Sequence, residues 1–302
     1  MKKFNITGTC IPEKNYTVDI SEKLRQIMNM VSEGDYFVIN RPRQYGKTTT
    51  LSLLRREILK HDEYLPVKLS FEGIGNTPFE SQESFCKYFI ELLIETLDNK
   101  DNNLRNLFYD RIGAVFNFVL LSKTITEIIK RTQKSVVLMI DEVDRSSDNQ
   151  IFMYFLGMLR DKFLKAREDD DVTFHSVILA GVHDIKTLKL KLRPDEERKY
   201  NSPWNIAADF SVDMSFSPTE IGTMLSDYIN QTKYSLDVKN ISQRIYFWTS
   251  GYPFLVSKLC KIIDESILID RDDKKWYVSD VDKAVSVLLS ESNTLFDDLK
   301  KT

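Results

Sequence analysis

Short runs of apolar residues alternate, up to about residue 215, with longer stretches in which apolar residues recur at helical spacing. Apolar runs of this kind predict strands that are buried on both faces, and the stretches between them predict helices. The predicted strands are 36–40, 67–71, 136–140, 174–181 and 210–214, and the predicted helices are 20–31, 48–60, 81–97, 104–132 and 149–165. Strands separated by helices indicate an α/β fold with a doubly wound parallel sheet, whose ligand site lies beyond the carboxyl ends of the strands.

The last part of the chain has a helical pattern throughout. Ser217, Pro218 and Glu220 form a capping-box sequence, which marks the start of a helix. The predicted helices are 218–230, 238–249, 253–266 and one that begins at Ser279 or Asp280, with a short strand at 276–278 before the last of them.

This order of elements predicts two domains, a sheet domain at 1–215 and a helical lid of winged-helix character at 216–302. Winged helices commonly bind DNA, and a DNA-binding domain is therefore the alternative for the second domain. The mixed charges of 270–275 are poorly suited to following a phosphate backbone.

Charge and cysteine content narrow the class of protein. Lys and Arg number 42 against 45 Asp and Glu, so no global basic field draws the chain to nucleic acid or to a membrane. The three cysteines lie far apart, which argues against a zinc site or a disulfide framework. No apolar run approaches the length of a membrane span, and no signal-peptide core precedes Cys10. We expect a soluble protein of a reducing, cytoplasmic compartment, without a targeting segment or a membrane partner.

The segment 41–50, RPRQYGKTTT, lies between the predicted strand 36–40 and the predicted helix 48–60. This is the order of a phosphate-binding loop, in which loop N–H groups and the positive end of the following helix surround a polyphosphate. Lys47 would reach the β- and γ-phosphates, and the hydroxyl of Thr48 would hold Mg²⁺. The residues expected to contact the nucleotide are Arg43, Gln44, Tyr45, Gly46, Lys47, Thr48 and Thr49.

The loop departs from the usual pattern at its first position, where Arg41 replaces a glycine. Pro42 favours extended geometry for Arg41, which suits the last residue of a strand. We expect Lys47 to be exposed at the edge of the sheet. The alternative is an ordinary strand, turn and helix that contains the letters GKT by chance.

A second site follows the apolar run 136–140, which ends on Asp141 and Glu142. At the carboxyl end of a central strand, Asp141 would hold the Mg²⁺ carried by Thr48, and Glu142 would polarise a water for attack on the γ-phosphorus. The alternative is a helix-capping cluster that includes Asp144. The phosphate-loop sequence upstream favours the metal site.

Taken together, the motifs resemble those of a known family. The segments RPRQYGKTTTL, MIDEVD, NSPWNIA and SGYPF are similar to those of bacterial AAA-like P-loop ATPases of the STAND and AAA+ neighbourhood, and the resemblance covers nearly the whole chain. It implies a five-stranded sheet in the order 5-1-4-3-2. It also implies that Glu142, beside the Walker B residue Asp141, is the catalytic glutamate.

The resemblance implies roles for three further regions. In STAND-like proteins a Gly-x-Pro turn of the lid helps to cover the nucleotide, and Gly251 and Pro253 match it; alternatively, Gly251 ends one helix and Pro253 starts the next. A polar sensor is expected where His183 follows the fourth strand, and a capping or surface residue is the alternative. Arg193 or Arg198 would supply an arginine finger, unless both belong to a solvated loop.

Other nucleotide-binding classes fit less well. The glycine of the GTPase D-x-x-G motif, the signature of ABC transporters and the arginine-rich lid of small-molecule kinases are all missing. We therefore expect ATP and Mg²⁺ as ligands and ATP hydrolysis by a switch or motor as the function. The alternative is a nucleotide-gated binding module with negligible turnover, for which DNA is one candidate target. A homo-oligomer, a protein partner and a DNA partner all stay open.

Overall fold

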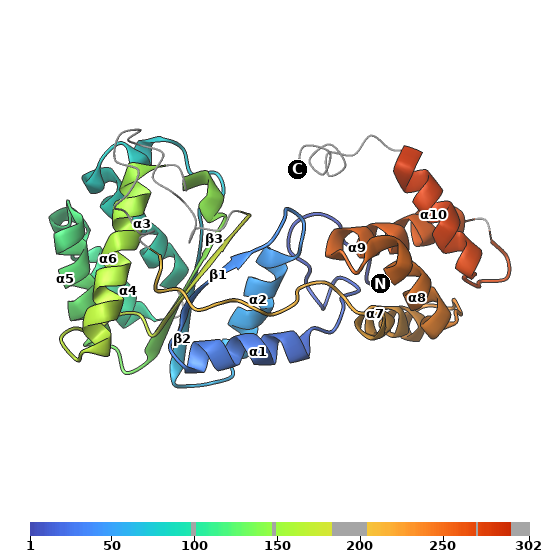
Figure 1. Cartoon of the computed structure of the whole chain (residues 1–302), viewed down its shortest axis with the longest axis horizontal. Helices are drawn as coiled ribbons and strands as arrows, with labels where there is room; N and C mark the ends of the chain where they lie inside the picture. Colours follow the sequence, from blue (N-terminus) through green and yellow to red (C-terminus); the bar gives the residue numbers. More distant parts are fainter. Residues whose placement is uncertain (98–100, 147–148, 183–203, 270, 291–302) are drawn as a thin grey trace. The chain divides into compact units, whose positions relative to one another are not determined.

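The computed structural model describes residues 1–97, 101–146, 149–182, 204–269 and 271–290 (Figure 1). The chain forms two compact units, each described by itself below. The sheet unit consists of Gln26–Arg41 and Leu51–Ser211, and the helical unit consists of Met1–Arg25, Pro42–Thr50 and the described part of Val212–Thr302. The helical unit therefore includes the N-terminal segment and the loop before residue 50. The division into domains at 215 and 216 stays a prediction.

Four parallel strands form the sheet unit's centre. They are β1 (Tyr36–Asn40), β2 (Tyr64–Ser70), β3 (Ser135–Asp141) and β4 (Ser176–Gly181), in the order β1-β4-β3-β2. In the parallel register Asn40 pairs with Gly181, and Ser70 pairs with Asp141. The carboxyl ends of the strands therefore meet at one edge of the sheet, which confirms the predicted parallel α/β architecture.

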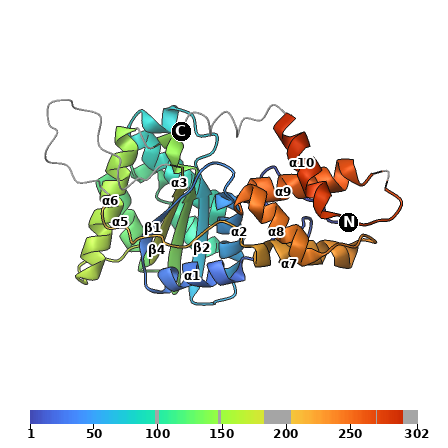
Figure 2. The same cartoon turned by 45° about the vertical axis from the view of Figure 1, so that its right-hand side comes forward.

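Helices cover both faces of this sheet. One face carries α3 (Gln82–Leu97), α4 (Asn102–Tyr109), α5 (Phe118–Ile129) and α6 (Gln150–Arg167), and α1 (Ser21–Ser32) and α2 (Lys47–Ile58) pack on the other (Figures 1 and 2). This follows from right-handed crossovers, because the chain crosses the sheet one way from β1 to β2 and returns through β3 to β4. The helix predicted over 104–132 is instead two helices, since Asn117 accepts the N–H of Leu120 at 2.9 Å and starts α5 anew.

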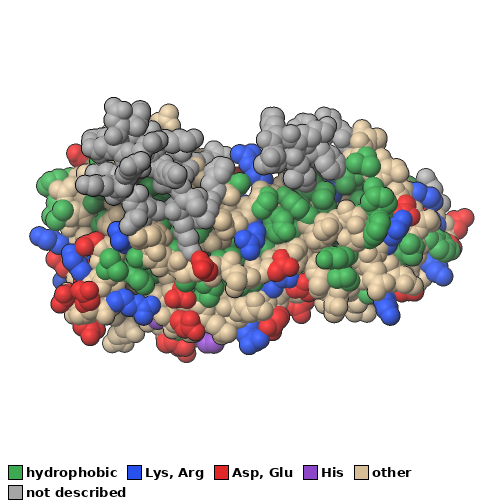
Figure 3. Space-filling view, viewed as in Figure 1, with side chains coloured by type: hydrophobic (Ala, Val, Ile, Leu, Met, Phe, Trp, Pro, Cys, Tyr) green, Lys and Arg blue, Asp and Glu red, His purple; other side chains and the backbone are tan. Residues whose placement is uncertain are grey.

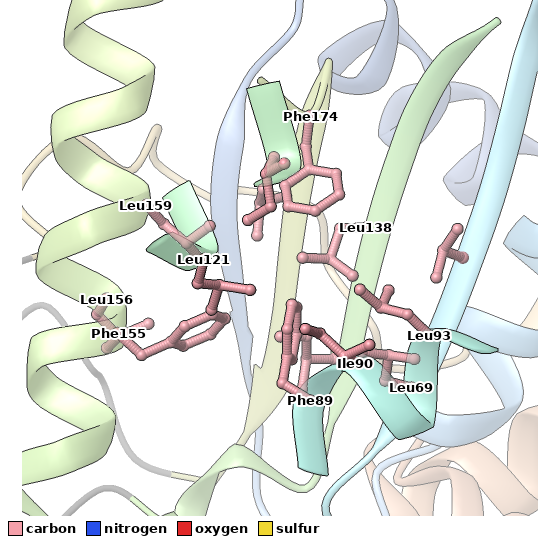
Figure 4. Packing of buried hydrophobic residues seen from close by; sticks show 14 of the residues in the cluster. Leu69, Phe89, Ile90, Leu93, Leu121, Leu138, Phe155, Leu156, Leu159 and Phe174 are labelled. Carbon is pink, nitrogen blue, oxygen red and sulfur yellow. The ribbon is translucent and has the colours of Figure 1, made fainter. Parts of the chain in front are cut away.

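An apolar cluster fills the space between the sheet and α3, α5 and α6 (Figure 4). Phe155 of α6 is central to it, because its ring centroid lies 4.9 Å from that of Phe89 and 5.0 Å from that of Phe85. Each large apolar side chain buried in this way contributes about 1.5–3 kcal/mol, which fixes the central strands. The labelled members are Leu69, Phe89, Ile90, Leu93, Leu121, Leu138, Phe155, Leu156, Leu159 and Phe174.

The fifth strand expected at 210–214 is not formed, so the described part of the sheet has four strands and not five. One isolated parallel bridge at Ala208, whose N–H donates to the carbonyl oxygen of Tyr36 at 2.8 Å, takes the position beside β1. Val212 and Met214 are buried, but from Val212 onward the chain belongs to the helical unit. Val212 and Met214, which contributed to the prediction of a strand, are therefore residues of the helical unit.

The helical unit contains α7 (Pro218–Gln231), α8 (Val238–Thr249), α9 (Pro253–Ile262) and α10 (Val278–Ser290). The predicted capping box is confirmed: the hydroxyl of Ser217 accepts the N–H of Glu220 at 3.2 Å, and the carboxylate of Glu220 accepts the N–H of Ser217 at 2.8 Å. Lys23, which belongs to the same unit, forms an ion pair with Glu220 at 2.5 Å.

The N-terminal segment completes the core of the helical unit. The rings of Phe4 and Tyr16 lie 5.3 and 5.2 Å from the ring of Tyr228 on α7. Trp276 packs on the same tyrosine, with ring centroids 5.1 Å apart. Residues from both ends of the sequence thus share one aromatic core.

The strand predicted at 276–278 is also not formed. One isolated bridge joins Ser235 to Lys275, and α10 begins directly after Tyr277. Buried Asp280 accounts for this early start, because its carboxylate accepts the N–H of Tyr277 at 2.8 Å. Within the described part of this unit no β-hairpin forms a wing, and the winged-helix character of the lid stays a prediction.

The surface carries charges of both signs. On the face of the sheet unit in Figure 3, acidic and basic side chains are interspersed. Charges of both signs on this face largely cancel each other's field at a distance. Of the helices that the structure describes, none combines the length and apolar character needed to cross a membrane.

Candidate nucleotide-binding site

The chain enters the candidate phosphate loop in extended geometry. The N–H of Arg41 donates to the carbonyl oxygen of Gly181 at 3.1 Å, so the ladder between β1 and β4 continues one residue past Asn40. This confirms the extended backbone that Pro42 predicts for Arg41. The guanidinium of Arg41 lies over the ring of Phe210, 5.4 Å from its centroid. The residue that replaces the first glycine is therefore accommodated by the sheet unit.

Two residues within the loop adopt left-handed backbone geometry. Gly46 has φ +79° and Gln44 has φ 57°, a conformation that is easy for glycine and rare for glutamine. In the described part of the chain, the peptide N–H groups of Gln44, Tyr45 and Gly46 have no protein acceptor. Successive unpaired N–H groups just before a helix N-terminus have the geometry of an anion-binding site.

Lys47, the first residue of α2, is only 6% exposed. Its ammonium donates to the carbonyl oxygen of Pro42 at 3.0 Å. The prediction of an exposed lysine was wrong, because the side chain folds back on the loop and satisfies its charge with a loop carbonyl. The ammonium is therefore already held within the loop.

The two threonines that follow differ in their contacts. The hydroxyl of Thr49 accepts the N–H of Cys10 at 3.1 Å, which ties the start of α2 to the N-terminal segment. Thr48 is half-buried, and no side-chain hydrogen bond within the described residues occupies its hydroxyl.

Cys10, the partner of Thr49, is uncharged. Burial raises the pKa of its thiol, so this cysteine stays a neutral thiol at physiological pH.

The turn between α8 and α9 packs against the loop inside the helical unit. Pro253 faces Gly46, where an added Cβ would lie 3.8 Å from the Cβ of the proline. The hydroxyl of Tyr252 donates to the carbonyl oxygen of Arg43, and its ring meets the ring of Tyr45 edge-on at 4.7 Å between centroids. The sequence analysis predicted a role for Pro253 and missed Tyr252. An aromatic residue between Gly251 and Pro253 was the feature that could have indicated it.

Gly251 fixes the course of this turn. It has φ +75°, and an added Cβ would lie 2.1 Å from the carbonyl oxygen of Phe216, whose N–H donates to Gly251 at 2.8 Å. Ser250 ends α8 and Pro253 begins α9. The helix-boundary interpretation is therefore correct, and the contact with the loop exists in addition to it.

Asp141 ends β3 at the carboxyl edge of the sheet and is 1% exposed. Its Oδ1 accepts the N–H of Glu142 at 3.0 Å, and its carbonyl accepts the N–H of Phe71 at 3.0 Å. Glu142 has φ 57°, so the chain turns sharply after the strand. Burial lowers the pKa of Lys68 on β2, and the carboxylate of Asp141 opposes this shift.

Asp144 has a role that the sequence did not reveal. Its carboxylate accepts the N–H of Val182 and occupies the space beside Gly181, where an added Cβ would lie 2.7 Å from its Oδ1. The carboxylate thus joins the segment after β3 to the end of β4. The cap of α6 is Asn149, which accepts the N–H of Ile151 at 2.8 Å, so a helix-capping role for Asp144 is wrong.

Three predicted site residues, His183, Arg193 and Arg198, lie outside the described residues. Trp204, from the NSPWNIA segment, is a core residue that stacks on Tyr36 at 5.8 Å between ring centroids. The loop belongs to the helical unit and Asp141 to the sheet unit, so each half of the predicted site is described within its own unit.

Comparison with known proteins identifies the family. The family model for the AAA-like domain matches residues 15–269, and the chain therefore belongs to the AAA-like domain family. This confirms the resemblance of the motifs to those of AAA-like P-loop ATPases. No curated protein matches the sequence.

Solved structures of similar fold include three archaeal proteins. The Walker-type ATPase PABY2304 of Pyrococcus abyssi has a TM-score of 0.61 at 12% identity, over 99% of this chain and 78% of that one. The ORC2 protein of Aeropyrum pernix, in ADPNP–ADP complexes, has a TM-score of 0.58 at 12% identity, over 97% and 73%. The ORC1 protein of the same organism, in complex with DNA, has a TM-score of 0.52 at 10% identity, over 90% and 65%. At these identities the likeness concerns the fold.

Proposed function

We propose that the chain binds Mg-ATP at the loop 42–46 and the start of α2 and hydrolyses it, as the nucleotide-driven switch or motor of a larger process. The observation that supports this most directly is that the N–H groups of Gln44, Tyr45 and Gly46, directly before Lys47, have no acceptor among the residues that the structure describes. These groups would donate to phosphate oxygens, and the positive end of α2 would add to the attraction.

Lys47 would change partner when the nucleotide binds. Its ammonium is bonded to the carbonyl of Pro42, and a phosphate oxygen is the stronger acceptor because it carries charge. The lysine is already buried in the loop, so little side-chain ordering remains to be done on binding.

The donor set fits a magnesium ion. A hydroxyl at Thr48 and a carboxylate at Asp141 are hard oxygen ligands, which Mg²⁺ takes together with water and phosphate oxygens. Bound Mg²⁺ would neutralise charge that develops on the β- and γ-phosphate oxygens. Phosphate oxygens of the nucleotide would supply further ligands to the ion.

Glu142 would act as the general base for hydrolysis. Its carboxylate would accept a proton from the attacking water as the oxygen approaches the γ-phosphorus, and the bond to the β-phosphate oxygen would break to give ADP and phosphate. The left-handed backbone at Glu142 is the kind of strain that clusters at active sites. His183 as a sensor and Arg193 or Arg198 as an arginine finger stay proposals drawn from the family alone.

A nucleotide-gated binding module with negligible turnover is the second candidate. It is favoured by the similarity of the fold to proteins whose structures contain DNA, the ORC1 protein of Aeropyrum pernix and the Drosophila ORC. DNA, a protein or further copies of the chain would then be the partner. Phosphate release measured across protein concentration, with and without duplex DNA, separates the candidates. Turnover that stays at background throughout would favour the binding module.

The test of the site uses Lys47→Ala, with Lys60→Ala as the matched control. Lys60 lies just beyond α2 and pairs with Glu57 at the surface, with 67% of its side chain exposed. Mg-ATP at a hundred times Kd should stabilise the wild type by about 2.7 kcal/mol, and this gain should persist in Lys60→Ala and disappear in Lys47→Ala. Isothermal titration of each variant gives the affinity directly. Equal ATP affinity in all three proteins would refute the site.

A further inference from the structure

We propose that Tyr252 positions the phosphate-binding loop by holding the peptide between Arg43 and Gln44. The inference rests on the proposed nucleotide site and assigns a residue outside its sequence motifs. Tyr252 lies 209 residues from Arg43 in the sequence, and its hydroxyl donates to the Arg43 carbonyl oxygen. The contact lies wholly within the helical unit.

The tyrosine is itself held firmly on both sides. Its N–H donates to the carbonyl oxygen of Thr249 at 2.9 Å, and it stands between Gly251, which is locked against Phe216, and a proline. Its ring rests edge-on against Tyr45 at 4.7 Å between centroids. Burial, with a contribution from Tyr45, raises the pKa of Tyr252 to about 12, so the hydroxyl keeps its proton and remains a donor at neutral pH.

Because the peptide bond is planar, the contact with the Arg43 carbonyl also fixes the direction of the next N–H group, that of Gln44. In a trans peptide the C=O and the following N–H point in opposite directions. Because Tyr252 holds the carbonyl of Arg43 on its own side, the N–H of Gln44 is directed away from Tyr252. This N–H is one of those without an acceptor in the described residues. The hydrogen bond therefore aims a donor where a phosphate oxygen can accept it.

The unusual sequence of the loop explains why such a restraint is needed. The first glycine is replaced by Arg41, and Gln44 adopts the left-handed conformation that L side chains rarely take. Contacts from the rest of the structure must hold such a residue in place. In this chain the restraint comes from the turn between α8 and α9.

The experiment compares Tyr252→Phe with Tyr246→Phe. Both changes remove only a phenolic hydroxyl from the helical unit, and Tyr246 on α8 is 40% exposed. The affinities for Mg-ATP and for magnesium tripolyphosphate are measured by isothermal titration, together with the melting temperature of the free protein. Tripolyphosphate is the decisive probe, because it has phosphates but no base. Tyr252→Phe should bind both ligands about 3- to 10-fold more weakly, as expected for one hydrogen bond, and melt within about 2 °C of the wild type. Tyr246→Phe should match the wild type.

Two results would overturn the inference and leave the site intact. One is unchanged affinity of Tyr252→Phe for both ligands. The other is a loss for ATP alone, which would mean that Tyr252 contacts the base or sugar. Absence of binding in the wild type would instead refute the proposed function.

A second measurement tests the peptide itself and needs no nucleotide. In amide nitrogen–proton spectra of the free protein, Tyr252→Phe should move the resonance of Gln44, and Tyr246→Phe should leave it in place. A Gln44 resonance that does not respond to Tyr252→Phe would contradict the inference even if affinity fell.

Discussion

The phosphate loop at 42–46 and the acidic end of β3 each contain a non-glycine residue with left-handed backbone, Gln44 and Glu142, but the two are held differently. Glu142 follows a strand whose neighbours on both sides are fixed by the sheet register, and its N–H is bonded to the adjacent Asp141. Within the described residues no strand neighbour supports Gln44, and the carbonyl of the preceding residue, Arg43, is held by Tyr252, 209 residues further along the chain. A motif can therefore be short in sequence and still depend on residues far from it.

The largest effect is expected on the free energy of unfolding, when the turn between α8 and α9 that contacts the loop is disrupted. Gly251→Ala places a methyl group against the backbone of Phe216 and strains a residue with φ +75°, so we expect a loss of about 2–5 kcal/mol in the free energy of unfolding. Gly157→Ala in α6, where an added Cβ meets nothing within 4 Å, should be neutral or stabilise by up to about 1 kcal/mol. Urea denaturation of both variants checks the contrast, and similar stability in the two would contradict the role of Gly251.

Substitutions at the acidic end of β3 should change ATP turnover or binding and leave the folding of the chain unchanged. Glu142→Gln retains the size of the side chain and removes the base, so turnover should fall on the order of 10²-fold, about 2.7 kcal/mol, at unchanged ATP affinity. Asp141→Asn should weaken both Mg-ATP binding and turnover. Phosphate release and titration of the two variants side by side provide the test. Wild-type turnover in Glu142→Gln would exclude this residue as the base.

Acid should weaken the helical unit through Asp280. Burial opposes ionisation of this carboxyl, but hydrogen bonds from Arg271 and from the N–H of Tyr277 hold its pKa below the usual range. Its contribution is complete above the unfolded pKa of about 3.9 and is lost as the pH falls through the lower folded pKa. Hydrogen bonds to a charged group of this kind contribute about 1.5–3 kcal/mol.

The pKa of Asp171 in the sheet unit is also lowered, because hydrogen bonds led by that from Lys162 overcome the effect of burial. Both carboxyl groups therefore contribute to the pH dependence of stability, and a variant of Asp280 is needed to isolate its share. Asp280→Asn keeps an acceptor for the N–H of Tyr277 and carries no charge. Its thermal unfolding between pH 5 and about pH 3 should depend on pH less steeply than that of the wild type. An equal slope would assign the acid response elsewhere.

The smallest effect is expected at Pro253, whose side chain contacts the loop, and it should be seen in the affinity for ATP. Pro253→Ala should weaken ATP binding about 3-fold, since the proline ring faces Gly46, and should change the stability of the free protein by about 1 kcal/mol or less. Pro218→Ala removes the equivalent first-turn proline of α7 and should leave ATP affinity unchanged. Equal affinities in both variants would return Pro253 to a purely structural role at the helix boundary.

Local patterns predicted the sheet unit well and the loop only in part. The run of apolar residues that ends on Asp141 gave β3 and its acidic end correctly, because a strand buried on both faces leaves a continuous apolar signature. The capping box at Ser217 was equally explicit. The burial of Lys47 and the role of Tyr252 were missed, since both depend on tertiary contacts that no spacing rule encodes.

Two predicted strands failed for a related physical reason. The segments 210–214 and 276–278 have suitable residue types, but strand formation needs a partner backbone along its length. In the structure each region makes a single bridge, at Ala208 and at Lys275. Which backbone is available for pairing is set by the whole fold.

During synthesis on the ribosome, the first residues of the chain emerge long before the residues that bury them. Phe4 and Tyr16 find their partner Tyr228 only after more than two hundred further residues have been made. The sheet unit ends at Ser211 and can assemble while α7 to α10 are still being translated. The turn that contacts the phosphate loop, residues 251–253, is translated after the whole sheet unit, so the loop would take its final conformation later than the sheet.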